Sequence, residues 1–120
     1  MRPTPGLVLV VDDNAGFRDL AARILHGWGY EVIEAGTVAD AVACVVERRP
    51  HTVLVDIGLP DGDGFELTRR LVALPSPPRV VLISTDADAG NRSTAHRIGA
   101  VGFLPKDELL GGALQGLITG

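Results

Sequence analysis

The stretch LVLVVDD, residues 7–13, is an apolar run that ends on two aspartates. The same arrangement occurs twice more, because the apolar run 52–55 leads to Asp56 and the run 80–83 leads to Ser84. Runs that are apolar at consecutive positions are typical of strands buried on both faces. If they are parallel strands of one sheet, their carboxyl ends lie side by side, at the edge where open α/β sheets bind ligands. We therefore expect an acidic pocket at this edge.

Helical patterns alternate with these strand patterns along the whole chain. Apolar residues recur at helical spacing after Asn14 and again after Thr37, and both residues are expected helix caps. The expected strands are 7–11, 30–35, 51–56, 79–84 and 101–104, and the expected helices are 14–27, 37–46, 64–74, 89–98 and 108–118. This alternation predicts a single α/β domain over residues 1–120 with a parallel sheet.

Composition narrows the class of protein. The 120 residues are enough for one hydrophobic core, and a net charge of -4 gives no basic field for nucleic acid, so no direct nucleic-acid binding is expected. The single Cys44 cannot form an internal disulfide and is expected to be a small buried hydrophobe. No signal peptide or membrane span is recognisable, which predicts a cytoplasmic protein without membrane contact.

The acidic strand ends favour a cation site. Carboxylates gathered in one pocket repel one another, and a hard divalent cation removes that repulsion. Mg²⁺ accepts one or two carboxylates and completes its shell with water and phosphate oxygens, and Mn²⁺ is the alternative ion. Such a site suits phosphoryl transfer, in which a carboxylate attacks phosphorus and an ammonium group neutralises the phosphoryl oxygens. Lys106 is the candidate ammonium.

Four motifs, in this order, resemble the receiver domain of two-component response regulators, the CheY-like superfamily. They are VDDN at 11–14, VDIGLPDGDG at 55–64, IS at 83–84 and GFLPK at 102–106. The resemblance covers essentially the whole chain and implies a flavodoxin-like fold of five strand–helix units, with helices on both faces of a parallel sheet in the order 2-1-3-4-5. It implies a phosphorelay signalling domain that is no enzyme beyond its own phosphotransfer and dephosphorylation.

The resemblance implies an acceptor and a metal site. Asp56 stands where the family has its phosphoryl acceptor. Asp13 is implied to bind Mg²⁺ directly and Asp12 through water. Asp56 and the backbone carbonyl of Gly58 would complete the protein's share of the ligands.

The resemblance also implies switching and tuning residues. Ser84 is the implied switch hydroxyl, Phe103 the coupled aromatic residue and Lys106 the phosphate-binding cation. Thr85 stands where the family usually has a smaller residue, and we expect it to crowd the route to the phosphoryl group. Asp86 occupies a position that influences attack by water.

The implied partners follow from the same family. They are a sensor histidine kinase or a phosphotransfer protein as phosphoryl donor, and a homodimer or output partner at the face of the fourth helix, fifth strand and fifth helix. The stretch FLPKDELL, residues 103–110, is most similar to receivers that precede a helix-turn-helix output domain. A stand-alone regulator is the main alternative.

Other interpretations of the same residues remain open. An aspartate-nucleophile phosphohydrolase would want a second carboxylate where Gly58 stands, and a flavin or nucleotide binder would want a phosphate loop after the first strand. A third alternative is a receiver fold used for phosphorylation-independent docking. Asp61 and Asp63 alternate with glycines as in a calcium loop, but turn chemistry explains them better. The scattered histidines His26, His51 and His96 do not have zinc-site spacing.

Overall fold

The computed structural model describes residues 4–85, 89–109 and 111–119. Its helices and strands follow one another in the order β1 Thr4–Val11, α1 Ala15–Gly27, β2 Glu31–Ala35, α2 Val38–Arg48, β3 Pro50–Asp56, β4 Gly58–Leu59, β5 Gly62–Asp63, α3 Gly64–Val72, β6 Arg79–Ser84, α4 Ala89–Arg97, β7 Gly102–Pro105, a 3₁₀ turn Lys106–Glu108, and α5 Gly112–Thr119. The predicted alternation of strands and helices is confirmed, and most boundaries differ from the expected ones by one or two residues.

One parallel sheet of five strands runs through the described chain, in the order β2-β1-β3-β6-β7. Numbered within this sheet alone, the order is the expected 2-1-3-4-5. Val11 pairs with both Ala35 and Val55, and Asp56 pairs with Ile83, so the strand ends lie level with one another. This register brings the acidic residues after β1 and β3 to the same edge, as predicted.

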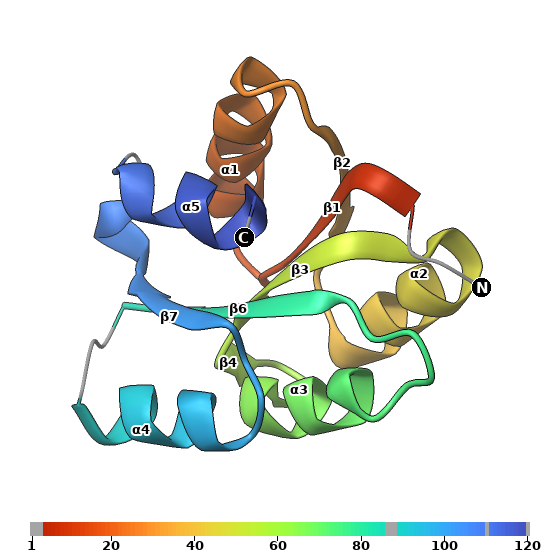
Figure 1. Cartoon of the computed structure of the whole chain (residues 1–120), viewed down its shortest axis with the longest axis vertical. Coiled ribbons are helices and arrows are strands. Elements are labelled where there is room, and N and C mark those ends of the chain that lie inside the picture. The colour runs from red at the N-terminus through yellow and green to blue at the C-terminus, as the bar shows by residue number, and fades with distance from the viewer. Residues whose placement is uncertain (1–3, 86–88, 110, 120) are drawn as a thin grey trace.

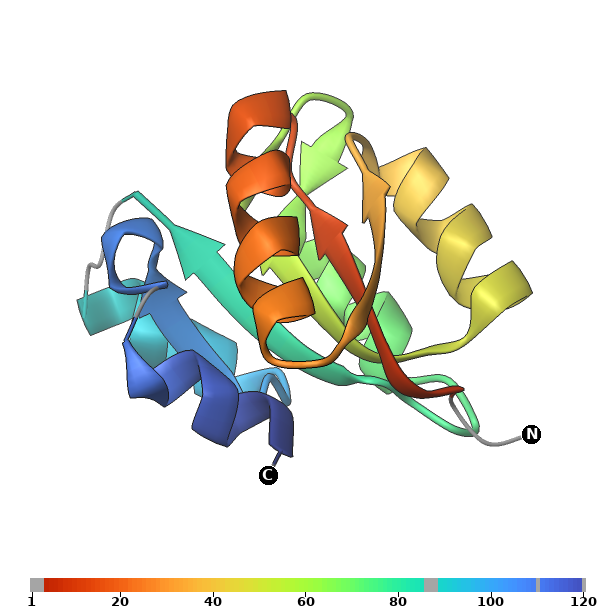
Figure 2. The same ribbon diagram turned by 90° about the horizontal axis from the view of Figure 1, so that it is seen from above.

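The helices divide between the two faces of the sheet. Buried side chains of α1 and α5 pack with Val8 and Val10 of β1, whereas those of α2, α3 and α4 pack with Leu9 and Val11. Figure 1 accordingly shows α1 and α5 on one side of the sheet and α3 and α4 on the other, and Figure 2 shows the same layers from above. Successive side chains of a strand point to opposite faces, so a strand covered on both sides must be apolar at every position.

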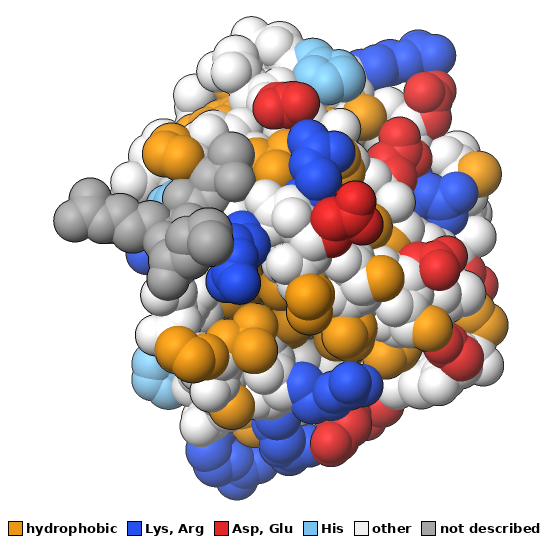
Figure 3. Space-filling view, turned by 90° about the vertical axis from the view of Figure 1, so that its right-hand side faces the viewer, with side chains coloured by type: hydrophobic (Ala, Val, Ile, Leu, Met, Phe, Trp, Pro, Cys, Tyr) orange, Lys and Arg blue, Asp and Glu red, His pale blue; other side chains and the backbone are white. Residues whose placement is uncertain are grey.

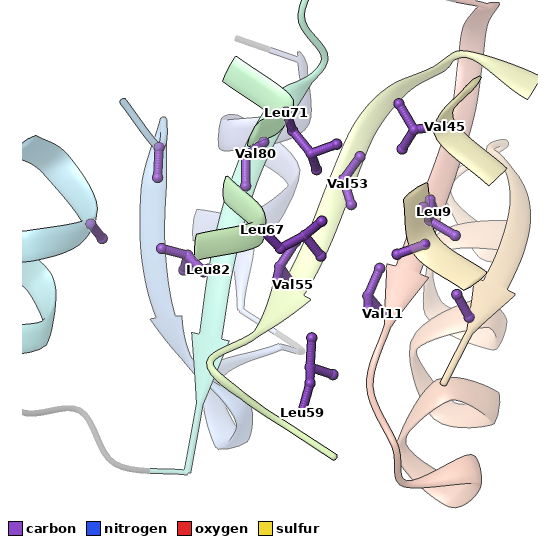
Figure 4. Close-up of a cluster of buried hydrophobic side chains, with 14 of the residues drawn as sticks. Leu9, Val11, Val45, Val53, Val55, Leu59, Leu67, Leu71, Val80 and Leu82 are labelled. Carbon is purple, nitrogen blue, oxygen red and sulfur yellow. The ribbon is translucent and has the colours of Figure 1, made fainter. Parts of the chain in front are cut away.

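The larger of the two cores lies under α2 and α3. Figure 4 shows its side chains converging from these helices and from the central strands, with Leu67 and Leu71 of α3 above Val53 and Val55 of β3. Leu67 is fully buried. Burial of one such side chain contributes about 1.5–3 kcal/mol, so this core holds α2 and α3 in place although both helices are short.

Polar side chains cap the N-termini of α1 and α2, as predicted. The Asn14 side chain accepts from the Phe17 amide at 3.0 Å, and the Thr37 hydroxyl accepts from the Asp40 amide at 3.1 Å. Each bond satisfies an amide that has no partner within its own helix.

The prediction for the last helix is wrong at its start. Instead of a helix from residue 108, a 3₁₀ turn at Lys106–Glu108 is followed by a break, and α5 begins at Gly112. Gly111 and Gly112 disfavour a continuous helix, and Leu109 between the two segments is 2% exposed because it packs into the core beneath α1 and α5. The short hairpin of β4 and β5 was not predicted.

Two further expectations concern the chain as a whole. Cys44 is partly buried and packs against the core, and burial, then Asp40 and Glu47, raises the pKa of its thiol, which favours the unreactive form. None of the helices in the described ranges is both long and apolar enough to cross a bilayer.

Candidate functional site

Three carboxylates gather at the carboxyl edge of the sheet. Asp12 and Asp13 follow β1 directly, and Asp56 is the last residue of β3. One carboxylate oxygen from each lies within 4.8 Å of the other two. Asp12 is fully buried, Asp56 is 8% exposed and Asp13 is exposed, so the cluster is open to solvent on the side of Asp13. The sequence prediction that these residues share a pocket is confirmed.

Lys106 supplies a positive charge to this cluster. Its Nζ lies 2.5 Å from Asp12 Oδ2 and 3.5 Å from Asp56 Oδ2. The same atom lies 4.6 Å from the centre of the Phe17 ring, a cation–π geometry. Partial burial opposes the charge of Lys106, but the two carboxylates outweigh it and raise the pKa of the ammonium group. Lys106 therefore remains charged at neutral pH.

Asp56 has an environment unlike that of a surface aspartate. Burial and then the Asp12 charge raise the pKa of its carboxyl group, and Lys106 and the Gly58 amide offset only part of this effect. The Gly58 amide lies 3.4 Å from Asp56 Oδ1, which is a long contact. The Asp56 carboxylate is buried beside the like charge of Asp12 and accepts a weak hydrogen bond from the Gly58 amide, so its oxygens remain available as nucleophiles. Additional positive charge beside it would stabilise its ionised form.

The two oxygens of Asp12 have different surroundings. Oδ1 accepts from the Asn14 amide at 2.9 Å, while the buried Oδ2 faces the Lys106 ammonium. No described backbone amide donates to Oδ2, so its contact is the charge-assisted one with Lys106. Arg18 holds the backbone nearby, since its Nη1 donates to the Asp12 carbonyl at 2.5 Å and its Nε pairs with Glu34.

These residues fit a divalent cation. The three carboxylates supply hard oxygen ligands from two adjacent strand ends, and Asp12 Oδ2 has acceptor capacity that protein amides do not fill. A single ammonium compensates only part of the cluster's negative charge. None of the three histidines belongs to a cluster of this kind within the described residues.

Two features shape the loop after Asp56: its aspartates accept hydrogen bonds from amides at the starts of two helices, and Gly64 packs closely against the Asp56 backbone. The Asp61 carboxylate accepts from the amides of Val38 and Ala39 at 2.7 and 3.2 Å, and Asp63 accepts from the Phe65 amide at 2.8 Å. Asp63 is therefore the N-cap of α3, and Asp61 accepts from free amides at the start of α2, which agrees with turn and capping chemistry and disagrees with a calcium loop. A Cβ atom on Gly64 would lie 2.3 Å from the Asp56 carbonyl oxygen, so this position requires glycine.

The residues of β6 and β7 complete the neighbourhood. Ser84 ends β6, is 3% exposed and pairs in register with Pro105, the residue before Lys106. Thr85 is exposed, and Asp86 lies outside the described residues. Phe103 is 6% exposed and packs into the core under α4. Its ring centre lies 5.6 Å from the Arg92 guanidinium, which also donates to the Phe103 carbonyl at 3.2 Å.

Sequence reasoning missed several residues that shape this site. Phe17 and Arg18 of α1 reach Lys106 and the Asp12 backbone, and Gly64 allows α3 to approach the Asp56 backbone. In the sequence, Phe17 shows only the helical spacing of a core residue and Gly64 the composition of a turn. Arg18 gives no signal, because its partners are distant in the sequence.

The fold and the acidic edge are those of a flavodoxin-like α/β domain, and the family comparison agrees. Residues 8–112 match the model of the response regulator receiver domain. The chain belongs to this family.

Individual relatives share the same domain. The chain is 32% identical over 105 residues to the phosphate regulon transcriptional regulatory protein PhoB of Pseudomonas aeruginosa, and 33% identical over 99 residues to the KDP operon transcriptional regulatory protein KdpE of Escherichia coli. Each match covers 82% of this chain and 44% of the relative, so the chain spans less than half the length of these relatives.

Solved structures show the same arrangement. A response regulator protein from Burkholderia pseudomallei, described with a phosphorylated aspartic acid, a calcium ion and citrate, is 27% identical with a TM-score of 0.84. The match covers 92% of this chain and 65% of that one.

Proposed function

We propose that this domain accepts a phosphoryl group on Asp56 in a reaction that requires Mg²⁺, and that the modification controls an output domain or partner. The observation that carries the proposal is the grouping of Asp12, Asp13 and Asp56 within 4.8 Å, with Lys106 Nζ 3.5 Å from Asp56 Oδ2. The family relationship supports it, because receivers are phosphorylated by sensor histidine kinases or phosphotransfer proteins.

The chemistry follows from the position of each group. An Asp56 carboxylate oxygen attacks the phosphorus of a phosphohistidine on the donor protein, forming an O–P bond as the donor's P–N bond breaks and its imidazole leaves with the electron pair. Lys106, which keeps its proton, attracts a phosphoryl oxygen and exchanges part of its contact with Asp12 for that oxygen. Burial of Asp56 limits competition by water for the same oxygens.

Asp12 and Asp13, with Asp56 and the carbonyl of Gly58, are the residues that would hold the metal. When bound there, Mg²⁺ supplies positive charge to the phosphoryl oxygens and offsets the repulsion between the carboxylates. The fully buried Asp12 is held by Asn14 and by the Arg18 contact to its backbone, which fixes the direction of its oxygens.

Switching is proposed to involve Ser84 and Phe103. An acyl phosphate on Asp56 adds acceptor oxygens beside the end of β6, to which the Ser84 hydroxyl can donate. Ser84 and Pro105 are paired in register, so a movement at Ser84 is transmitted to β7 and to Phe103 two residues earlier. The output face would be that of α4, β7 and α5, through which a homodimer or an output domain would act. Thr85 is proposed to slow phosphoryl transfer or hydrolysis, which Thr85→Ala would reveal as changed rates.

The test is the intact mass of the chain after incubation with acetyl phosphate and Mg²⁺. We expect one phosphoryl adduct that depends on Mg²⁺, is lost in Asp56→Asn and is greatly reduced in Asp13→Asn. Asp61→Asn is the matched control, since Asp61 is an exposed aspartate in the same region whose carboxylate caps α2. No adduct, or an adduct that persists in Asp56→Asn or forms equally in EDTA, would contradict the proposal, and the absence of any adduct would favour phosphorylation-independent docking.

A further inference from the structure

An apolar groove opens between the ends of α2 and α3, away from the acidic site. It has a volume of about 260 Å³ and is lined by residues that include Val45, Val46, Arg49, Leu74, Pro75 and Pro78. We call it the α2–α3 groove. A smaller hollow of about 100 Å³ adjoins it, shares Val45, Val46 and Leu74, and adds Arg70. Figure 3 looks onto this side of the molecule and shows hydrophobic side chains gathered across its middle, with both basic and acidic side chains around them.

Two large hydrophobic side chains of the groove are exposed to solvent. Val46 is 63% exposed, more than the other large hydrophobic residues described, and Leu74 is 36% exposed, close to Val101 at 37% and below Leu20 at 47%. The segment Pro75–Pro78 carries three prolines, whose fixed φ angles make this wall stiff. A stiff apolar surface binds a partner with little loss of conformational entropy.

The charged residues that line the groove have one sign. No aspartate or glutamate lines either hollow, whereas Arg49 and Arg70 each contribute a guanidinium. Across all the residues that the structure describes, neither of these side chains has an ion-pair or hydrogen-bond partner. The lining of the groove is therefore basic, on a chain whose net charge is -4. A partner with acidic side chains beside apolar ones complements it.

Arg49 adds a second observation. It is the C-cap of α2 and has a φ of 50°, the one non-glycine residue of the described chain in the left-handed region. Glycine is favoured at such a position, and a residue with a Cβ costs about 1–2 kcal/mol there. An arginine is thus held at the rim of the groove at some expense of stability.

From these observations we infer that the α2–α3 groove binds an acidic amphipathic helical segment of a partner protein. Its apolar side chains would enter the groove beside Val46 and Leu74, and its carboxylates would pair with Arg49 and Arg70. A second copy of the chain fits less well, because a two-fold contact through this face would bring arginines of both copies together. A volume of about 260 Å³ is below the usual range of small-molecule pockets, about 300–1,000 Å³.

The inference goes beyond the proposed phosphorylation and is independent of it. The groove lies beside Pro50, where β3 begins, and Asp56 lies at the other end of the same strand. The six residue steps of extended strand from Pro50 to Asp56 span about 20 Å.

The experiment uses two synthetic peptides of about 18 residues, a length that supports a helix. One has leucines along one helical face and glutamates elsewhere, and the other has lysine in place of each glutamate. Binding is measured by fluorescence polarisation, and the site is mapped from amide chemical shifts of the isotopically labelled chain. We expect the glutamate peptide to bind with shifts confined to the α2–α3 groove, to bind more weakly at high salt, and to bind more tightly than the lysine peptide.

Variants separate this role from a structural one. Arg49→Gly is expected to lower the affinity for the glutamate peptide by about threefold, as for the loss of one exposed ion pair. The variant itself is expected to be at least as stable as the wild type. The double variant Arg49→Gly, Arg70→Gln is expected to lower this affinity by about tenfold. Arg23→Gln, which removes the same charge from α1, is the control and leaves binding unchanged.

Three results would overturn the inference: equal binding of both peptides, chemical shifts that map elsewhere, or no binding at millimolar peptide. Concentration-dependent dimerisation with shifts in the groove would instead assign it to a second copy and would also overturn it. Phosphorylation by acetyl phosphate is expected to be unchanged in Arg49→Gly, so failure here and failure of the Asp56 proposal are distinguished.

Discussion

Replacement of Gly64 by alanine tests how the chain positions Asp56, its proposed phosphoryl acceptor. The added Cβ would lie 2.3 Å from the Asp56 carbonyl oxygen and 2.7 Å from the Ile57 Cα atom, and both are backbone atoms that no side-chain rotation can move away. Ordinary contact begins at 3.4 Å, so α3 or the end of β3 must move by about 1 Å. The Gly64 amide also donates to the Ile57 carbonyl at 3.1 Å, which ties the two segments together.

The expected cost lies at the upper end of the range for overpacking, about 2–3 kcal/mol. With a urea m-value of about 2 kcal/mol/M, the unfolding midpoint falls by about 1–1.5 M. Gly116→Ala in α5 is the matched control, because nothing lies within 4 Å of its new Cβ and alanine favours a helix interior. It is expected to stabilise the chain by about 0.5–1 kcal/mol. An unchanged or higher midpoint for Gly64→Ala would refute the close packing at Asp56.

Three further predictions rest on single interactions. Because burial and Asp12 raise the pKa of Asp56, its ionisation opposes folding, so Asp56→Asn without Mg²⁺ should be more stable than the wild type at pH 7, with the difference lost below about pH 4 in thermal unfolding. The amides of α2 lower the pKa of Asp61, so Asp61→Ala should destabilise the chain at pH 7, and the difference should shrink as the pH falls through the lowered pKa of Asp61. Arg79 donates to the Leu117 carbonyl at 3.0 and 2.9 Å, so Arg79→Met should cost about 1.5–3 kcal/mol in urea unfolding; no change would dismiss this bond as a link to α5.

The position of Lys106 has consequences for how the site would respond to a phosphoryl group. Its Nζ lies nearer to Asp12 than to Asp56, and the Phe17 ring covers it. Lys106 contacts both Asp12, a proposed metal ligand, and Asp56, the proposed acceptor, and so links the two proposed functions of the acidic cluster. Any new oxygen at Asp56 would compete with Asp12 for the same ammonium.

The sequence alone determined the layout of the domain. Strands with apolar residues at every position can only be buried on both faces, which requires helices on each side and a parallel sheet. Asn14 and Thr37 mark helix starts because capping is a bond over three residues, and such bonds can be read from local sequence. The meeting of Asp12, Asp13 and Asp56 could also be predicted, since the ends of parallel strands lie at one edge.

Only the tertiary structure decided contacts between elements that are distant in the sequence. Asp61 caps a helix whose first residue is Val38, Lys106 reaches Asp12, and the α2–α3 groove combines Arg49 with Leu74. The break before α5 belongs here as well, because the burial of Leu109 depends on packing beneath α1 and α5. Local sequence fixes the φ and ψ preferences and the apolar faces of single elements. The distances between elements depend on how all the side chains pack at once, and no short window of sequence contains that information.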